Sequence, residues 1–124
     1  DGNRWATPAS MIIAVASRPE YDCRIKEREY YLFDSGMATA FVILRATELG
    51  LVAPPIAGYS EKKAKEALNI PEDMRLITLV IVGRHSKEIK PLLTKEQAQT
   101  EPERPERKPL SGMAFEDSYH EESE

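Results

Sequence analysis

The stretch from Asp34 to Tyr59, DSGMATAFVILRATELGLVAPPIAGY, constrains the fold more than any other part of the sequence. Asp34 and Ser35 are residue types that cap helix starts, and Gly50 is a typical helix end. Between these ends only two residues are charged, and apolar side chains cover nearly every direction around the axis. The sequence therefore predicts a helix over residues 35–49 that is buried on most of its circumference.

The loop after this helix, VAPPIAGY, is apolar and contains two prolines and a glycine. Prolines stiffen a loop, and small side chains leave backbone amides open to the approach of a flat ligand. A buried helix followed by a rigid turn is the simpler interpretation of the same residues. From the residues alone, both interpretations stay open.

Two further apolar runs predict buried strands. Residues 11–16 read MIIAVA, and residues 76–83 lie in the run RLITLVIVG. Short continuous runs rich in branched side chains fit strands that are covered on both faces. Between them, residues 61–68 predict a charged surface helix with Ser60 as its N-cap and Asn69 at its end. Helices and strands of this kind indicate an α+β domain.

Composition excludes several classes of function. The net charge of −4 and the lack of a basic, aromatic-rich stripe argue against nucleic-acid binding. No apolar run reaches the roughly 20 residues of a membrane span. The single cysteine, Cys23, excludes an internal disulfide, and we expect a cytoplasmic protein. The two histidines, His85 and His120, are too far apart to suggest a metal site, and no side chain has the setting of a catalytic acid, base or nucleophile.

The composition changes near Ser86. Residues 86–109 hold four prolines and many charges but few apolar side chains, so this segment cannot bury enough surface to fold alone. We expect residues 1–85 to form the core portion of the domain and residues 86–124 to form an extended arm. On composition alone, the charges of the arm are best interpreted as a solvated run.

Several motifs resemble, in this order, the C-terminal half of the nitroreductase family. They are D-x-G-x-A at Asp34, E-L-G-L at Glu48, P-I-A-G-Y at Pro55, L-N-I-P-E at Leu68, Val82-Gly83, and R-K-P-L at Arg107. No single motif is specific, but the ordered set covers most of the chain. The resemblance implies an α+β fold with a central, mostly antiparallel sheet flanked by helices. It also implies an incomplete domain, because the family's N-terminal phosphate-gripping helix and ring-side loop have no counterpart here.

The resemblance further implies an FMN-dependent oxidoreductase. Such an enzyme uses NAD(P)H to reduce nitroaromatics, quinones or similar small-molecule acceptors in a ping-pong cycle. Pro55, Ile56, Ala57 and Gly58 would line the flavin ring, with a backbone amide near Ala57 or Gly58 directed at ring atom N5. Arg107 and Lys108 would hold the FMN phosphate from an arm that crosses a partner subunit, and Arg104 is a weaker third candidate.

The same residues allow two other functions. The chain is either this enzyme or, as an alternative, a non-catalytic flavin-binding or dimerisation module that lacks the N-terminal phosphate-binding half. A purely structural α+β domain is a third possibility, because fold alone does not fix function. The apolar helix leads us to expect a homodimer, or association with a separate N-terminal segment.

Overall fold

The structure is a computed structural model of the chain, and it describes residues 2–88, 91–103 and 105–119. These residues divide into two compact units, Asp1–Leu92 and Leu93–Glu124, and each unit is described by itself. Among the described residues, no helix combines the length and apolar character that a bilayer span requires.

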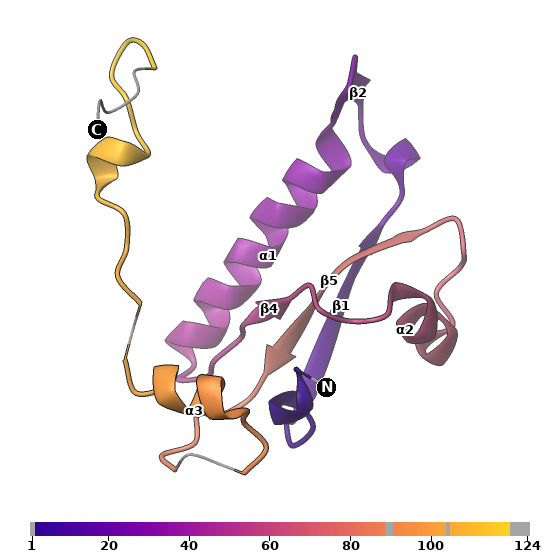
Figure 1. The fold of residues 1–124 in the computed structure, drawn as a ribbon. Helices are drawn as coiled ribbons and strands as arrows, with labels where there is room; N and C mark the ends of the chain where they lie inside the picture. The colour runs from indigo at the N-terminus through magenta and orange to yellow at the C-terminus, as the bar shows by residue number, and fades with distance from the viewer. Residues whose placement is uncertain (1, 89–90, 104, 120–124) are drawn as a thin grey trace. The chain divides into compact units, whose positions relative to one another are not determined.

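The first unit is built on an antiparallel sheet in the order β1-β5-β4 (Figure 1). These strands are β1, Met11–Ser17; β4, Pro55–Ile56; and β5, Arg75–Val82. Strand β1 pairs with β5 along its whole length, with a register shift between Val15 and Ala16. The short strand β4 pairs with the other edge of β5, at Val80 and Leu79.

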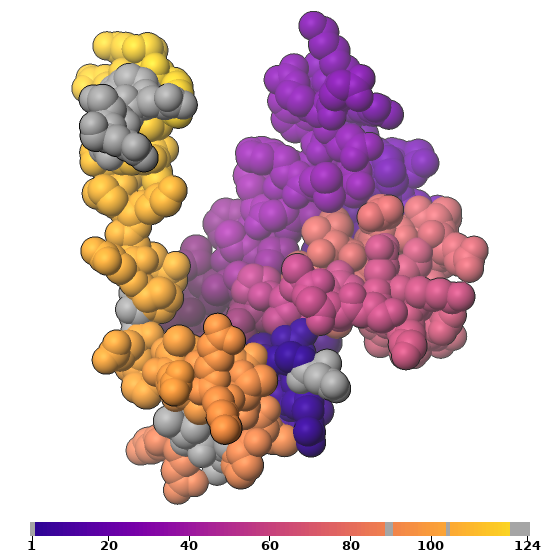
Figure 2. All heavy atoms as spheres, viewed as in Figure 1, coloured from indigo at the N-terminus to yellow at the C-terminus, as the bar shows by residue number. Residues whose placement is uncertain are grey.

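Helices and a hairpin complete this unit. Helix α1, Tyr30–Glu48, contacts β1 and β5 and lies across one face of the sheet (Figure 1). The other elements are the short helices η1, Arg4–Ala6, and η2, Pro19–Tyr21; the paired strands β2, Arg24–Ile25, and β3, Arg28–Glu29; and helix α2, Glu61–Leu68. In the space-filling view, the β2–β3 hairpin and the first turns of α1 project beyond the rest of the unit (Figure 2).

The core lies between α1 and the central strand. Val80 of β5 is fully buried, and it clusters with Val82, with Ala46 of α1 and with Ala53 of the following loop. The small side chains of Ala46 and Ala53 allow close packing at this point, and partly buried branched residues of β1 and α1 close the cluster. The antiparallel α+β fold expected from the sequence is therefore present.

Helix α1 begins earlier than the sequence predicts. It starts at Tyr30, directly after the β2–β3 hairpin, and not at residue 35. Ser35 does not cap the helix, because its hydroxyl donates to the carbonyl of Tyr31 one turn earlier, at 2.7 Å. Tyr31 is buried, so tertiary packing of the first turn outweighs the local capping preference. The helix ends as predicted, with Gly50 in the left-handed region at φ +69°.

The predicted burial of this helix is wrong for the described chain. Within α1 only Tyr31, Thr39 and Ala46 are buried. On the opposite face, four large apolar residues three and four positions apart form a line that we call the α1 stripe. The members of the α1 stripe and their exposed fractions are Phe33, 59%; Met37, 44%; Phe41, 70%; and Leu44, 61%. The start of β1 is likewise open, because Met11 and Ile12 are each more than half exposed, so this strand is not covered on both faces.

The second helix follows the expected local chemistry. The Ser60 hydroxyl accepts a hydrogen bond from the Lys63 amide, and Asn69 closes α2 in the left-handed conformation at φ 54°. The helix has no buried residue and therefore lies on the surface, as predicted.

The second unit contains helix α3, Lys95–Thr100, and the short helix η3, Leu110–Gly112. Helix α3 was not predicted from the sequence. A capping box explains its position, because the Thr94 hydroxyl accepts from the Gln97 amide while the Gln97 side chain accepts from the Thr94 amide. No described residue of this unit is buried, in keeping with its few apolar side chains.

Candidate functional site

The residues predicted to line a flavin ring lie in one loop, Pro54 to Tyr59, which we call the 54–59 loop. Three alternate carbonyl groups of this loop accept hydrogen bonds. The Ile81 amide donates to Pro54 at 3.0 Å, the Thr78 hydroxyl to Ile56 at 2.9 Å, and the Asn3 side-chain amide to Gly58 at 2.7 Å.

The donors of these hydrogen bonds change along the loop from backbone amides to side chains. At Pro54 the donor is a backbone amide of β5, as in any sheet. Pairing between β4 and β5 ends with Ile56 and Leu79, where the Thr78 hydroxyl adds a side-chain hydrogen bond to the Ile56 carbonyl. Beyond this pair, the Asn3 side chain holds Gly58. The loop therefore leaves the sheet while its backbone stays fixed by Thr78 and Asn3.

Tyr59 fixes the far end of the loop. Its hydroxyl donates to the Leu76 carbonyl at 2.6 Å, and its amide donates to the Ala57 carbonyl at 3.0 Å. Partial burial, followed by the negative charge of Glu61, raises the pKa of the Tyr59 phenol, so it stays protonated at neutral pH and keeps donating.

The other edge of the 54–59 loop is open. Ala57 and Gly58 are exposed, and their amides donate no hydrogen bond within the described part of the chain. Pro55 has no amide hydrogen to offer. The open edge thus presents backbone donors beside small side chains, which is what a flat heterocycle with acceptor nitrogens requires.

The two predicted phosphate-binding residues lie elsewhere in the chain. Arg107 and Lys108 belong to the second unit, in an exposed segment without regular secondary structure. Arg104 is outside the described residues. The 54–59 loop thus brings the four ring-side residues together, while the phosphate role of Arg107 and Lys108 stays a prediction.

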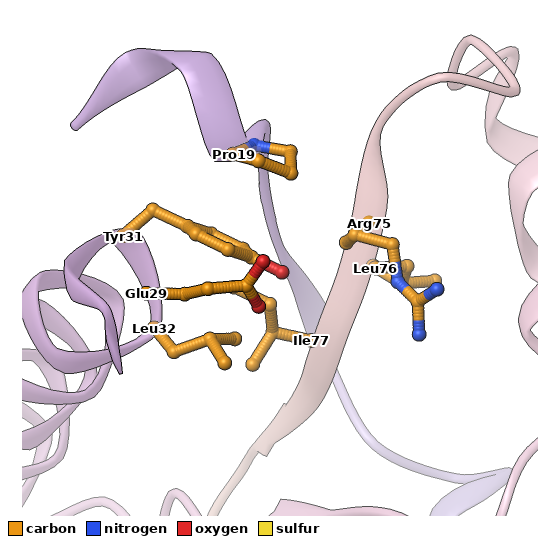
Figure 3. Close-up of a pocket in the computed structure, with 7 residues that line it drawn as sticks. All are labelled: Pro19, Glu29, Tyr31, Leu32, Arg75, Leu76 and Ile77. Atoms are coloured by element: carbon orange, nitrogen blue, oxygen red, sulfur yellow. The ribbon is translucent and has the colours of Figure 1, made fainter. Parts of the chain in front are cut away.

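A separate cavity of about 460 Å³ lies in the first unit (Figure 3). Its lining residues are Pro19, Glu29, Tyr31, Leu32, Arg75, Leu76 and Ile77. Glu29 at the end of β3 and Tyr31 in the first turn of α1 extend toward β5. The Arg75 guanidinium turns to the other side of the strand, where its Nε lies 3.7 Å from a carboxylate oxygen of Glu61. None of the predicted site residues lines this cavity.

Two carboxyl groups and the thiol lie together at the base of the hairpin. A hydrogen bond with Asp22, then local desolvation, raises the pKa of the Asp34 carboxyl. Local desolvation and the charge of Asp22 raise the pKa of the Cys23 thiol, which therefore lacks the depressed pKa of a reactive cysteine.

No group of three potential metal ligands occurs among the described residues, and His85 is exposed.

The sheet, the covering helix and the 54–59 loop define part of a nitroreductase-like α+β fold. The model of the nitroreductase family matches residues 2–84, so the chain belongs to this family. The family predicted from the sequence motifs is confirmed.

Individual relatives agree with this assignment. A protein of Mycolicibacterium smegmatis, described as an uncharacterized 15.4 kDa protein in the ask 5' region, is 32% identical over 82 residues, which are 66% of this chain and 54% of that protein. The solved nitroreductase family protein from Clostridium novyi NT is 33% identical with a TM-score of 0.61, over 64% of this chain and 44% of its own. A solved oxidoreductase containing FMN is 29% identical with a TM-score of 0.74, over 94% and 59%. The chain thus spans about half the length of these relatives.

Sequence reasoning missed the side chains that hold the loop. Asn3 was not identified from the sequence, and Thr78 appeared only within an apolar run. A hydroxyl inside the run RLITLVIVG is the one local signal for Thr78. Its partner, Ile56, lies 22 residues away, so only the fold reveals the contact.

Proposed function

We propose that the protein is an FMN-dependent oxidoreductase that uses NAD(P)H to reduce nitroaromatic, quinone or similar acceptors by a ping-pong mechanism. Bound FMN would supply the chemistry, accepting hydride from the nicotinamide and passing electrons to the acceptor. The chain would bind and orient the flavin and needs no acid, base or nucleophile for this. We place the protein in the cytoplasm.

The observation that carries this proposal is the hydrogen bonding of the 54–59 loop. The carbonyls of Pro54, Ile56 and Gly58 accept hydrogen bonds, whereas the amides of Ala57 and Gly58 donate none within the described residues. A fixed, open backbone donor with no side chain in the way fits an aza-aromatic ring lying against the loop. Pro55 and Ile56 would supply apolar contact to the ring. The solved relative that contains FMN supports the same choice of flavin.

Arg107 and Lys108 would bind the FMN phosphate. Both are exposed, and arginine offers paired, charge-assisted hydrogen bonds to phosphate oxygens. Because they belong to a segment with no buried residue, we propose that this arm becomes ordered against a partner subunit.

The α1 stripe supports association with another chain. Four large apolar side chains in a line, each 44–70% exposed, are costly to leave in water. We propose a homodimer that buries this face, with a separate N-terminal segment as the other possible cover.

Nicotinamide oxidation tests the proposal. The 124-residue chain, mixed with FMN and then freed of unbound flavin, should be yellow. Under anaerobic conditions, this bound flavin should bleach when NADH or NADPH is added. Oxidation of NADH or NADPH should resume when a quinone or nitroaromatic is supplied as electron acceptor. A colourless protein that ignores FMN would contradict the proposal.

A second function is supported by two features of the described residues that need no catalysis, namely the unused amides of the 54–59 loop and the exposed α1 stripe. In this alternative, the chain is a non-catalytic flavin-binding or dimerisation module. It predicts flavin binding or dimerisation without nicotinamide oxidation. Turnover by the 124-residue chain would exclude it.

A further inference from the structure

We infer that Thr78 is a positioning residue that aims the Ala57 amide at the flavin. This inference rests on the proposed function, because it assigns a task within the same site. Thr78 lies on β5, beyond the last backbone pair between β4 and β5, and its hydroxyl donates to the Ile56 carbonyl at 2.9 Å.

The geometry of one peptide group links Thr78 to Ala57. The Ile56 carbonyl and the Ala57 amide belong to the same planar trans peptide, so they point in opposite directions. Holding that carbonyl toward β5 therefore turns the Ala57 N–H away from β5, toward the open edge. The ladder pair between Ile56 and Leu79 sets this direction, and the Thr78 hydroxyl reinforces it without contacting the flavin.

The neighbouring peptide groups are held independently. The next peptide carries the Ala57 carbonyl, which accepts from the Tyr59 amide, and the one after carries the Gly58 carbonyl, which accepts from Asn3. Because these groups are fixed by other donors, loss of the Thr78 hydroxyl would loosen mainly the peptide between Ile56 and Ala57, which would keep only its ladder pairing with Leu79. The effect should therefore be local.

The shortness of β4 explains why an additional hydrogen bond from Thr78 matters at this point. Ile56 is the last residue of β4, and Pro55 has no N–H to pair with β5. The pair Ile56–Leu79 is the last of the ladder, so the strand end is held by few backbone bonds. A threonine in the partner strand adds a side-chain donor at this end of the ladder and still has the branched shape that a strand accepts.

The test compares variants that keep the shape of the side chain. Thr78→Val removes the hydroxyl at nearly constant volume, Thr78→Ser restores it, and Thr78→Ala is a second hydroxyl-free variant should valine pack badly. Thr39→Val is the matched control, because the Thr39 hydroxyl donates to the Ser35 carbonyl within α1, away from the loop.

The readout is amide hydrogen exchange of the 124-residue chain with and without FMN. FMN should protect the Ala57 amide in the unsubstituted chain, in Thr78→Ser and in Thr39→Val. In Thr78→Val and Thr78→Ala this protection should fall by about three- to tenfold, the value of one hydrogen bond. Exchange at the core residue Val80 should not change, which separates positioning from a general loss of stability.

Two results would overturn the inference, and they differ. Equal FMN-induced protection of Ala57 in the unsubstituted chain and in both hydroxyl-free variants would refute the role of Thr78 alone. No FMN-induced protection at any amide of the unsubstituted chain would refute the proposed function, and this inference with it.

Discussion

Removing the most exposed ring of the α1 stripe should weaken self-association without unfolding the chain. In Phe41→Ala the ring is lost from a side chain that is 70% exposed in the single chain. Such a site contributes little to folding, so the free energy of unfolding of the monomer should change by less than about 0.5 kcal/mol. The same exposed surface is what a partner subunit would cover.

The size of the effect follows from that exposure. Full burial of a phenylalanine is worth about 1.5–3 kcal/mol, so covering the exposed part of Phe41 is worth about 1–2 kcal/mol. A twofold interface contains the residue twice, which gives about 2–4 kcal/mol for the dimer. The dissociation constant should therefore rise by about 30- to 800-fold.

Sedimentation equilibrium over a range of concentrations measures this constant directly. Leu68→Ala is the matched control, because Leu68 is a half-exposed apolar residue on α2, outside the α1 stripe. It should leave the dissociation constant unchanged. The reasoning is refuted if the unsubstituted chain sediments as a monomer throughout, or if both substitutions weaken association equally.

Three further predictions concern the folded chain. Val80→Ala should lower the free energy of unfolding by about 2 kcal/mol, measured by denaturant, because it opens a cavity beside a fully buried side chain; Val42→Ala, at a partly exposed site, should cost clearly less. Ser60→Ala should cost about 0.5–1 kcal/mol through loss of the α2 cap, and an unchanged unfolding midpoint would contradict it. An NMR titration should place the midpoint of Asp34 above 3.8, and Asp22→Asn should lower it. Since the folded state then binds the proton more tightly than the unfolded state, the contribution of Asp34 and Asp22 to stability falls as the pH rises from 3.8 through the raised pKa. A midpoint at or below 3.8 would contradict the raised pKa.

Helix ends were predictable where a single residue type decides the local backbone. Gly50 and Asn69 both adopt the left-handed conformation that ends a helix, and Ser60 caps the next one. In each case the chemistry lies within four residues of the boundary. Sequence alone therefore located the end of α1 and both ends of α2.

The start of α1 was not predictable in the same way. Asp34 and Ser35 have the chemistry of a cap, yet the hairpin and the buried Tyr31 extend the helix by five residues. The exposure of Phe41 was also misjudged, because an apolar helix gives no sign of whether its cover is its own sheet or another chain. Long-range packing decides both points.

In the candidate site too, a local motif was predictable from the sequence, whereas its long-range contacts were not. Pro55 to Gly58 were identified by their resemblance to a family motif, and their small side chains gave a physical reason for it. The hydrogen bonds that fix this loop join it to Asn3 and Thr78, which are 55 and 22 residues from their partners. Contacts at such separations leave no local pattern in the sequence.

The most direct test of the central claim is a titration of the 124-residue chain with FMN, followed by visible absorption and flavin fluorescence. We predict saturable binding with quenched flavin fluorescence. Ala57→Pro, which removes the amide donor, should weaken binding, and Ala57→Ser, which retains the donor, should not. Flavin fluorescence that stays unchanged at every concentration of the unsubstituted chain would contradict the claim that the 54–59 loop binds FMN.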